Sequence, residues 1–596
     1  MNQQAIFHQT YSEYCFALAQ NHVVLRLRAA KNDLNDCRVF YGDRMDSQNP
    51  LRTTEVVMQK KHSDLLFDYF EADIFPNVTR LCYYFLLSDG KQCFYYYNSS
   101  FLKNPSDNRQ LYFQLHYIRS ENIAQVPDWA KKAIIYQIYP DSFASGKREI
   151  TRKGKKIRGS DGLVSRSKFG GTLRGIAQNI DYLKTLGINC IYLNPIFRAN
   201  SWHKYDTIDY RDIDPCFGIK EDFKALVETC HQNGIRIMID GVFNHCSPDF
   251  FAFRDVLKNG ETSRFRDWFY MSGFPVIQEP APNYECFAYV ATMPKLNTGD
   301  PEVKRYLIDT ALYWTETFHI DAWRLDVANE IDFDFWRSFR KELKAVDPDI
   351  FLVGEIWDDA RAFLQGDQMD SVMNYNLYYA CIDFFALGKM IAKEFDERIH
   401  YLSIRYKENI QQVQMNLIDS HDVPRFLTSA AGDIRKLKLA ALFLFTYIGI
   451  PSIYYGDEKG LKGQQEIDYR RPMDWENPEG ELFEYYRRLI KLRSENIDAM
   501  LGDFETIQAD GSLYIYRRKS KMTCITIGIN NAEASCEVSF AVSTNKGIYT
   551  DPVNKHHISV QNGLAHLTLS GFDAAVMIES KRQARRRLDN RERPRL

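Results

Sequence analysis

The sequence lacks the patterns that would place it in several common classes of protein. Its 12 cysteines are scattered with no CxxC pair, which argues against a structural zinc site or a disulfide framework and favours a reducing compartment. No run of about eighteen apolar residues is present, so we expect no membrane span. There is no GKS or GKT phosphate loop and no GxSxG motif, and the GG pair at 170–171 lacks the other glycines of a dinucleotide-binding fingerprint.

The chain also lacks an excess of charge of one sign. Its formal net charge is −2 over 596 residues, so no general attraction to nucleic acid or to an anionic membrane is expected. The first twenty residues show no basic segment followed by an apolar run, which predicts a cytoplasmic protein without a signal peptide. Aromatic content is 14 %, which suits surfaces that stack on sugar-like ligands, although an aromatic-rich core accounts for most of it.

Several domains are expected, because the length exceeds what one core needs. Residues 1–125 contain short runs of β-branched and aromatic residues separated by Gly, Asn and Asp, which predicts an N-terminal β-sandwich. Residues 506–580 are again β-rich and predict a small antiparallel C-terminal domain. The last stretch, 581–596, is strongly basic and has few apolar residues, so we expect a disordered tail, with binding to a polyanion as the alternative.

Between these domains, residues 126–505 alternate short apolar strands with longer amphipathic stretches. Eight such units in one domain predict a (β/α)₈ barrel of the TIM type. The long gap between the third and fourth strands predicts an inserted subdomain at about 246–299. The expected strands are 134–139, 188–194, 235–240, 320–327, 351–355, 371–375, 414–419 and 451–456.

Polar residues follow several of these strands at the point where each ends. They are Asp240, Asn244 and His245 for the third strand, Arg324 and Asp326 in the fourth, Glu355 for the fifth, His421, Asp422 and Arg425 for the seventh, and Asp457 and Glu458 for the eighth. Residues two apart in a strand share a face, so Arg324 and Asp326 point the same way. A structural ion pair would explain that strand alone. Carboxylates from three strands, meeting at the carboxyl end of a barrel, indicate an active site.

Converging Asp and Glu residues without a cysteine or metal-ligand cluster suit glycoside hydrolysis. One carboxylate attacks the anomeric carbon, and a second, held protonated, donates to the leaving oxygen. Asp326 is the candidate nucleophile, and we expect Arg324 to keep it ionised, since a nearby cation favours the charged form. Glu355 follows the apolar strand FLVG, which favours a protonated carboxyl group and the acid/base role. Asp422, His245 and His421 would contact the hydroxyls of the same sugar.

Four motifs resemble the main conserved regions of glycoside hydrolase family 13, the α-amylase family. They are DGVFNH (240–245), WRLDVANE (323–330), GEIW (354–357) and LIDSHD (417–422), in the same order. MPKLN (293–297), the VANE ending and HKYDT (203–207) resemble the neopullulanase, cyclomaltodextrinase and maltogenic amylase subfamily. The resemblance covers about residues 130–580, and the N-terminal sandwich resembles the starch-binding-like domain of that subfamily.

The resemblance implies a role for each matching residue. Asp326 matches the nucleophile, Glu355 the acid/base and Asp422 the transition-state stabiliser. Arg324, His245 and His421 match the residues around the scissile sugar, Tyr205 matches the aromatic platform beneath it, and Trp357 the contact on the leaving side. Glu330 matches a position that influences linkage preference and transfer. Asp206 and Asp240 are expected to hold the site in shape.

Two segments depart from the family pattern. The loop after YPDSFASG, often rich in Asn and Asp and able to bind calcium, is here GKREITRKGKKIRGSDG, which is heavily basic. Asp161 alone could not form a calcium site, so we expect no required cofactor. Many relatives pair an Asp with the arginine at position 470; here Glu466 stands in that place, which changes the reach toward the next sugar.

Three functions remain open from the sequence. The first is a retaining hydrolase acting on cyclodextrins, maltooligosaccharides and pullulan, and the second is a glucanotransferase using the same residues. The third is a non-catalytic glucan-binding protein on the same fold. The resemblance also implies a homodimer in which the N-terminal domain covers the active site of the partner.

Overall fold

A computed structural model describes residues 1–146, 155–158, 164–477 and 479–580. Asp161 and the basic tail lie outside the described residues. The chain divides into two compact units. One contains Met1–Val126, Arg361–Gly366 and Met390–Gln412, and the other contains Pro127–Ala360, Asp367–Lys389 and the chain from Val413 onward. No helix in the described part is both long and apolar enough to cross a membrane.

The first unit is built on two antiparallel sheets, as predicted for an N-terminal sandwich. One sheet has the order β1-β2-β6-β5 and the other β4-β3-β7-β8-β9, with β10 paired to β7. Alternate residues of facing strands, including Val23, Leu25, Val39 and Phe85, form one buried core. The strands are β1 Cys15–Ala19, β2 His22–Ala30, β3 Asp36–Asp43, β4 Thr54–Val57, β5 Gln59–Ser63, β6 Phe67–Ile74, β7 Leu81–Ser88, β8 Cys93–Tyr97, β9 Ser100–Leu102 and β10 Phe113–Leu115.

Helices α9 (Ala392–Ser403) and α10 (Glu408–Gln411) belong to this unit although they follow the sixth barrel strand in the chain. Arg26 on β2 donates a 2.9 Å hydrogen bond to the carbonyl of Ile404. His62 on β5 lies with its Nδ1 2.8 Å from Nδ1 of His400 on α9. These contacts tie the segment from Met390 to the sandwich.

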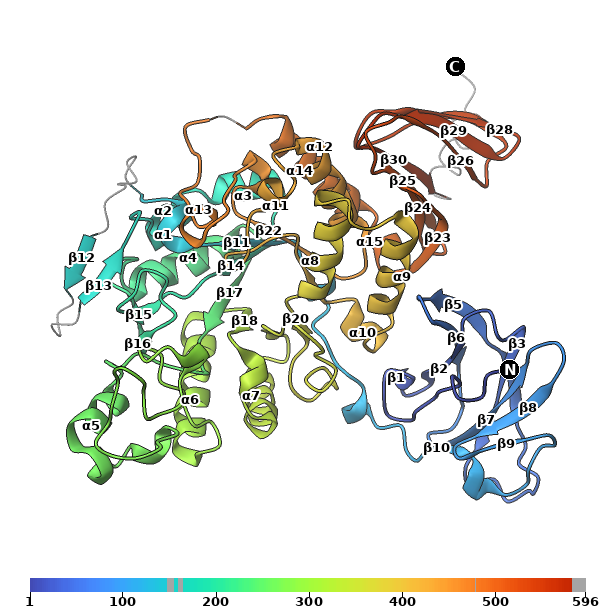
Figure 1. Ribbon diagram of the computed structural model, residues 1–596, viewed down its shortest axis with the longest axis horizontal. Coiled ribbons are helices and arrows are strands. Elements are labelled where there is room, and N and C mark those ends of the chain that lie inside the picture. Colours follow the sequence, from blue (N-terminus) through green and yellow to red (C-terminus); the bar gives the residue numbers. More distant parts are fainter. Residues whose placement is uncertain (147–154, 159–163, 478, 581–596) are drawn as a thin grey trace, which may run out of the picture. The chain divides into compact units, whose positions relative to one another are not determined.

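The second unit contains the predicted (β/α)₈ barrel. Its eight strands are parallel and follow the order β20-β19-β18-β17-β14-β11-β22-β21, and a bridge between Met373 and Met415 joins the two ends of the sheet. Figure 1 labels β11, β14, β17, β18, β20 and β22 in this sheet. Each strand lies in or overlaps a segment predicted from the sequence. The strands are β11 Ile135–Ile138, β14 Cys190–Leu193, β17 Arg236–Gly241, β18 Ala322–Leu325, β19 Phe351–Gly354, β20 Ser371–Val372, β21 Met415–Asn416 and β22 Ile450–Tyr454.

Helices surround these strands and begin where the sequence places capping residues. Asp300 and Asp332 each accept hydrogen bonds from two backbone N–H groups at the starts of α6 (Pro301–Phe318) and α7 (Phe333–Val346). The amphipathic stretch between the first two barrel strands forms two helices, because the helix breaks at Asn179. Other helices of this unit include α2 Leu173–Gln178, α3 Ile180–Leu186, α4 Lys220–Gln232, α8 Tyr375–Cys381, α12 Ile434–Thr446 and α14 Glu481–Glu495.

The expected insertion after the third strand is present and is mostly irregular. It contains α5 (Phe251–Asn259) and short 3₁₀ turns, including η6 (Phe287–Tyr289). Bridges from His245 to Lys295 and from Cys286 to Pro294 fold its second half back along the end of β17. The insertion therefore borders the carboxyl end of the barrel strands.

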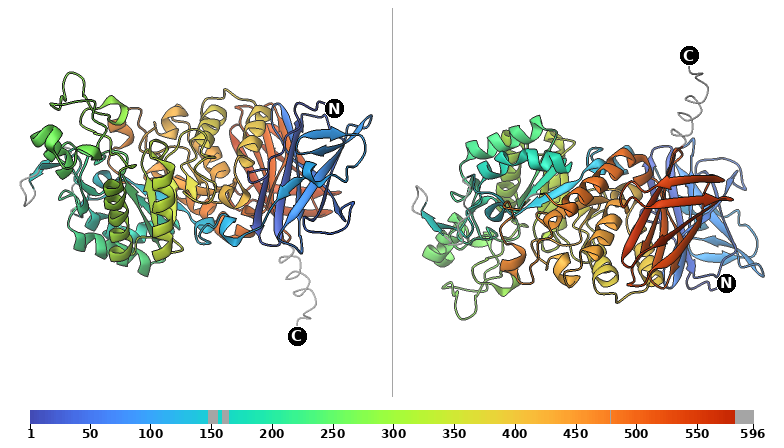
Figure 2. Two further views of the ribbon diagram at one scale, coloured as in Figure 1. Left: turned by 90° about the horizontal axis from the view of Figure 1, so that it is seen from below. Right: turned by 90° about the horizontal axis from the view of Figure 1, so that it is seen from above.

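The C-terminal part consists of two antiparallel sheets, as predicted (Figures 1 and 2, dark orange to red). Their orders are β23-β24-β25-β30 and β26-β29-β28-β27, and a buried core between them includes Ile515, Val538 and Ile558. The strands are β23 Asp503–Asp510, β24 Leu513–Lys519, β25 Thr523–Asn530, β26 Cys536–Ala541, β27 Lys546–Thr550, β28 His557–Gln561, β29 Leu564–Leu569 and β30 Asp573–Ser580.

Candidate active site

One buried arginine gathers the carboxylates at the carboxyl end of the barrel. Nη1 of Arg324 lies 2.8 Å from Oδ1 of Asp326 and 2.9 Å from Oδ1 of Asp240, while Nη2 lies 2.9 Å from Oε2 of Glu355. Asp422 is 3.9 Å from the same guanidinium. The period of two along β18 and the parallel register with β17 and β19 bring these groups together.

The two oxygens of Asp326 have different surroundings. Oδ1 accepts a hydrogen bond from Arg324, whereas Oδ2 is buried and has no hydrogen-bond partner among the described residues. Removing one carboxylate oxygen from water without a partner is costly, so such an atom suggests a functional role. Oδ2 is therefore the oxygen available to a substrate.

Burial raises the pKa of Asp326 well above its usual range; Arg324 lowers it, while Glu355 and Asp240 raise it further. Arg324 favours the ionised form of Asp326, which is the effect expected of it, and opposes the effects of burial and of the two neighbouring acids. Burial and Glu355 likewise raise the pKa of Asp422 to about 7, against the opposing effect of Arg324 and Arg470. Such close carboxyl groups titrate together and favour holding a shared proton.

Glu355 is held at both of its oxygens. Oε1 accepts a 3.0 Å hydrogen bond from the indole Nε1 of Trp357, and Oε2 accepts one of 3.0 Å from the backbone N–H of Val327. Trp357 stacks on Tyr375 with the ring centroids 3.7 Å apart and the planes 4° from parallel. The position of the predicted acid/base is therefore set by a stacked aromatic pair and by the turn after β18.

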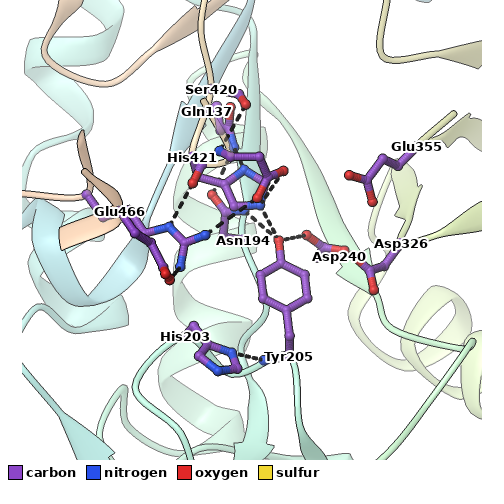
Figure 3. Close-up of polar contacts among 12 residues, drawn as sticks. Gln137, Asn194, His203, Tyr205, Asp240, Asp326, Glu355, Ser420, His421 and Glu466 are labelled. Carbon is purple, nitrogen blue, oxygen red and sulfur yellow. Dashed lines mark hydrogen bonds and ion pairs between the residues drawn. The ribbon is translucent and has the colours of Figure 1, made fainter. Parts of the chain in front are cut away.

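Tyr205 lies at the centre of a hydrogen-bond network (Figure 3). Its hydroxyl donates to Asp240 at 3.0 Å and lies 2.5 Å from Nε2 of His421. Burial lowers the pKa of His421 well below 6.5, so the ring is neutral. Because Nδ1 accepts a 2.7 Å hydrogen bond from the amide of Gln137, the proton lies on Nε2, facing Tyr205 and Asp422.

His245 occupies another part of the wall. Its ring stacks on Phe287 with centroids 5.0 Å apart, and its buried Nε2 has no hydrogen-bond partner in the described part of the chain. Burial lowers the pKa of His245 to about 3, so this ring is also neutral. The side chain can exchange a hydrogen bond with a sugar hydroxyl without adding charge to the site.

Two further ion pairs lie at the rim. Lys295 Nζ lies 3.2 Å from Oε2 of Glu330 and also donates to the amide oxygen of Asn244. Arg470 donates through Nη1 to Oε1 of Glu466, and its Nη2 lies 3.5 Å from Oδ1 of Asp422. The longer Glu466 side chain therefore still reaches Arg470.

These side chains enclose a cavity of about 510 Å³, a size that suits a short oligosaccharide. Nine of the eleven predicted site residues line it, and Arg324 and His421 lie behind its wall. A larger hollow of about 700 Å³ over the C-terminal strands has one acidic residue, Glu579, in its lining and no comparable carboxylate cluster. The cavity is lined by His203, Tyr205, His245, Phe287, Met293, Asp326, Val327, Asn329, Glu330, Glu355, Trp357, Asp422, Glu466, Tyr469 and Arg470.

Sequence reasoning missed several residues of this site. Gln137 is a buried polar residue within the apolar strand segment IIYQIY, and Asn194, which donates to Tyr205 at 3.1 Å, ends the next strand. A polar residue in an otherwise apolar barrel strand was the available signal. Phe287 and Tyr375 carried no comparable signal, because aromatic residues are common throughout the chain.

A closed barrel with acidic groups clustered around an arginine at the carboxyl ends of its strands is the arrangement of a barrel glycoside hydrolase. Comparison with known proteins agrees. Residues 137–480 match the model described as "Alpha amylase, catalytic domain", and residues 1–119 match "Alpha amylase, N-terminal ig-like domain". The chain belongs to the α-amylase family, glycoside hydrolase family 13, and is a glycoside hydrolase.

Similar proteins include a cyclomaltodextrinase and a neopullulanase. A cyclomaltodextrinase from Geobacillus thermopakistaniensis (strain MAS1) is 44% identical over 91% of this chain and 93% of its own length. Neopullulanase 2 from Thermoactinomyces vulgaris is 41% identical over 96% of this chain and 99% of its own. A solved structure titled cyclomaltodextrinase superposes with a TM-score of 0.91 and 37% identity, covering 97% of this chain and 100% of that one.

Proposed function

We propose that this protein is a retaining hydrolase of α-1,4-glucosidic bonds in cyclodextrins and maltooligosaccharides, with pullulan and its α-1,6 bonds as further substrates. The observation that carries the proposal is the contact of one buried arginine with Asp326 and Glu355 in the wall of one cavity. The names of its relatives, a cyclomaltodextrinase and a neopullulanase, support the choice of substrates.

In the first step, Oδ2 of Asp326 attacks the anomeric carbon while Glu355 transfers a proton to the departing glycosidic oxygen. The C–O bond to the leaving glucan breaks as the ester bond to Asp326 forms. In the second step, Glu355 takes a proton from water, which attacks the same carbon and releases Asp326. Arg324 balances the carboxylate charge in both steps, and Asp422 binds hydroxyls of the distorted sugar.

A glucanotransferase would form the same covalent intermediate and differ only in the group that resolves it. Initial products from β-cyclodextrin, pullulan and soluble starch therefore separate the two functions. Hydrolysis gives no product with more glucose units than the substrate, and NMR of the first product should show the α-anomer. Products longer than the substrate would identify transfer, and an initial β-anomer would contradict the retaining mechanism.

Asp326→Asn tests the nucleophile directly. We expect kcat to fall by about a thousandfold or more, because the amide cannot form the ester intermediate. The near-equal size of Asn should leave the thermal unfolding temperature within a few degrees of the wild-type value. Asp326→Asn with near-normal hydrolysis would overturn the assignment of the nucleophile. A wild-type protein that binds these glucans without cleaving them would instead leave the third possibility, a non-catalytic glucan-binding protein.

No metal is included in this proposal. Asp141, in the YPDSFASG segment that precedes the loop able to bind calcium in relatives, accepts hydrogen bonds from the Ser167 hydroxyl at 2.5 Å and from backbone N–H groups of Lys168 and Phe169. Donors surround this carboxylate where a cation would need free oxygens. Activity that survives dialysis against EDTA is the expected result; loss that calcium reverses would contradict it.

We further propose a cytoplasmic homodimer in which the N-terminal domain narrows the active site of the partner. All 12 cysteines fall within the described residues, and none is in a disulfide, which is consistent with a reducing compartment. The match of residues 1–119 to the family's N-terminal domain supports the dimer. Light scattering at micromolar concentration should give twice the chain mass of 69.7 kDa; a monomer would contradict it.

A further inference from the structure

The turn Phe287–Val290, beside the catalytic cavity, has an unusual backbone. Ala288 and Tyr289 both lie in the left-handed region, with φ of +48° and +61°, and the N–H of Val290 donates to the carbonyl of Phe287 at 2.8 Å. Two consecutive residues of this kind form a turn that normally requires Gly or Asn. Alanine and tyrosine are therefore poorly suited to it.

Surrounding hydrogen bonds hold the turn in this conformation. The N–H of Phe287 donates to the carbonyl of Met293 at 3.0 Å, and the hydroxyl of Tyr284 donates to the carbonyl of Ala291 at 2.7 Å. Phe287 and Met293, at the two ends of the segment, both line the catalytic cavity. The turn is therefore fixed to the cavity wall.

The strained turn presents a tyrosine ring to solvent. Tyr289 is 91% exposed, although its side chain is large and partly apolar. Such a ring adds nothing to the packing of the core, and its backbone conformation is unfavourable for tyrosine. A local feature that costs stability without a packing benefit indicates a functional role.

We propose that Tyr289 is a specificity-determining residue that stacks on a glucosyl unit lying outside the catalytic cavity. This inference rests on the proposed function. The apolar C–H face of glucose complements the electron-rich face of an aromatic ring. The cavity of about 510 Å³ holds a short oligosaccharide, so longer linear and cyclic glucans must extend past its rim, where Tyr289 lies two residues from Phe287.

The turn itself provides variants that separate binding from folding. Tyr289→Asn removes the ring but suits the left-handed backbone, so the thermal unfolding temperature should stay equal or rise. Tyr289→Phe keeps the ring and controls for the hydroxyl. Ala288→Gly relieves the neighbouring strain while leaving the ring in place, and controls for changes in the flexibility of the turn.

The test compares maltotriose with maltohexaose. For Tyr289→Asn we expect KM for maltohexaose to rise about three- to tenfold, with maltotriose kinetics changed less than twofold, while Tyr289→Phe and Ala288→Gly remain near wild type on both. Equal effects on the two substrates, no effect on either, or loss of the dimer in Tyr289→Asn would overturn the inference. A wild-type protein that cleaves neither substrate would instead overturn the proposed function.

Discussion

The indole Nε1 of Trp357 donates a 3.0 Å hydrogen bond to Oε1 of Glu355, the carboxyl group proposed to act as acid and base. Trp357→Phe should retain the stack on Tyr375 but lose this donor. We expect kcat on maltotriose to fall about tenfold or more, as for loss of a hydrogen bond to a charged group. Trp129→Phe, which removes a 2.9 Å bond to the carbonyl of Asp349, is the matched control and should leave kcat unchanged.

Arg324 is the residue whose replacement should affect both activity and stability. Arg324→Lys keeps one positive charge, but its single nitrogen cannot replace both Nη1, which contacts Asp326 and Asp240, and Nη2, which contacts Glu355. We expect kcat to fall at least about a hundredfold and the free energy of unfolding to fall by about 3–5 kcal/mol, because buried carboxylates lose their partner. A lysine variant with wild-type kinetics and an unchanged unfolding temperature would show that the guanidinium geometry is unimportant.

Much of this site could be predicted from the sequence because strand ends in a parallel barrel converge. Once β17, β18 and β19 are recognised, Asp240, Asp326 and Glu355 must meet at one edge. The contact of Gln137 with His421 could not be predicted in the same way, since it joins the first strand to the loop after the seventh and depends on closure of the barrel.

The pKa shifts of the site and the strained backbone turn also could not be predicted from the sequence. A sequence shows that Arg324 is near Asp326, but the extent of desolvation, which raises the pKa of Asp326, depends on packing from every side. The left-handed conformation of Ala288 and Tyr289 contradicts the usual preference of both residue types. The local sequence therefore favours a different turn from the one that tertiary contacts impose.

Glu330 is expected to influence the balance between transfer and hydrolysis. Its side chain lines the cavity and is 43% exposed, so its carboxylate can accept hydrogen bonds from the hydroxyls of an incoming sugar. The ion pair between Oε2 and Nζ of Lys295, 3.2 Å apart, holds the side chain in this position. Glu330→Ala should lower the share of transfer products several-fold while kcat for hydrolysis changes less than about twofold. Chromatography of maltotriose digests measures both quantities. Equal loss of both activities would place Glu330 in the hydrolytic machinery instead.

Asp422 should make the protein less stable as the pH rises toward 7. A salt-bridged acid on the surface, whose pKa is lowered on folding, has the opposite effect. Its pKa is raised from 3.8 to about 7, so between these values the folded protein holds a proton that the unfolded chain has released. Stability contributed by this proton is present at low pH and is lost as the pH rises through about 7. One full proton changes the free energy of unfolding by about 1.4 kcal/mol per pH unit. The Asp422 side chain is 21% exposed, and screening by water makes the pH dependence smaller than this value.

Asp422→Asn should therefore reduce the fall in unfolding temperature between pH 5 and pH 7, since the amide does not titrate. Thermal scans of wild type and variant at both pH values measure the difference. Asp267→Asn, at a carboxyl group that is 74% exposed, is the matched control and should follow the wild-type profile. If Asp422→Asn also follows that profile, another carboxyl group of the cluster around Arg324 carries the shared proton, and the assignment of the proton to Asp422 would be wrong.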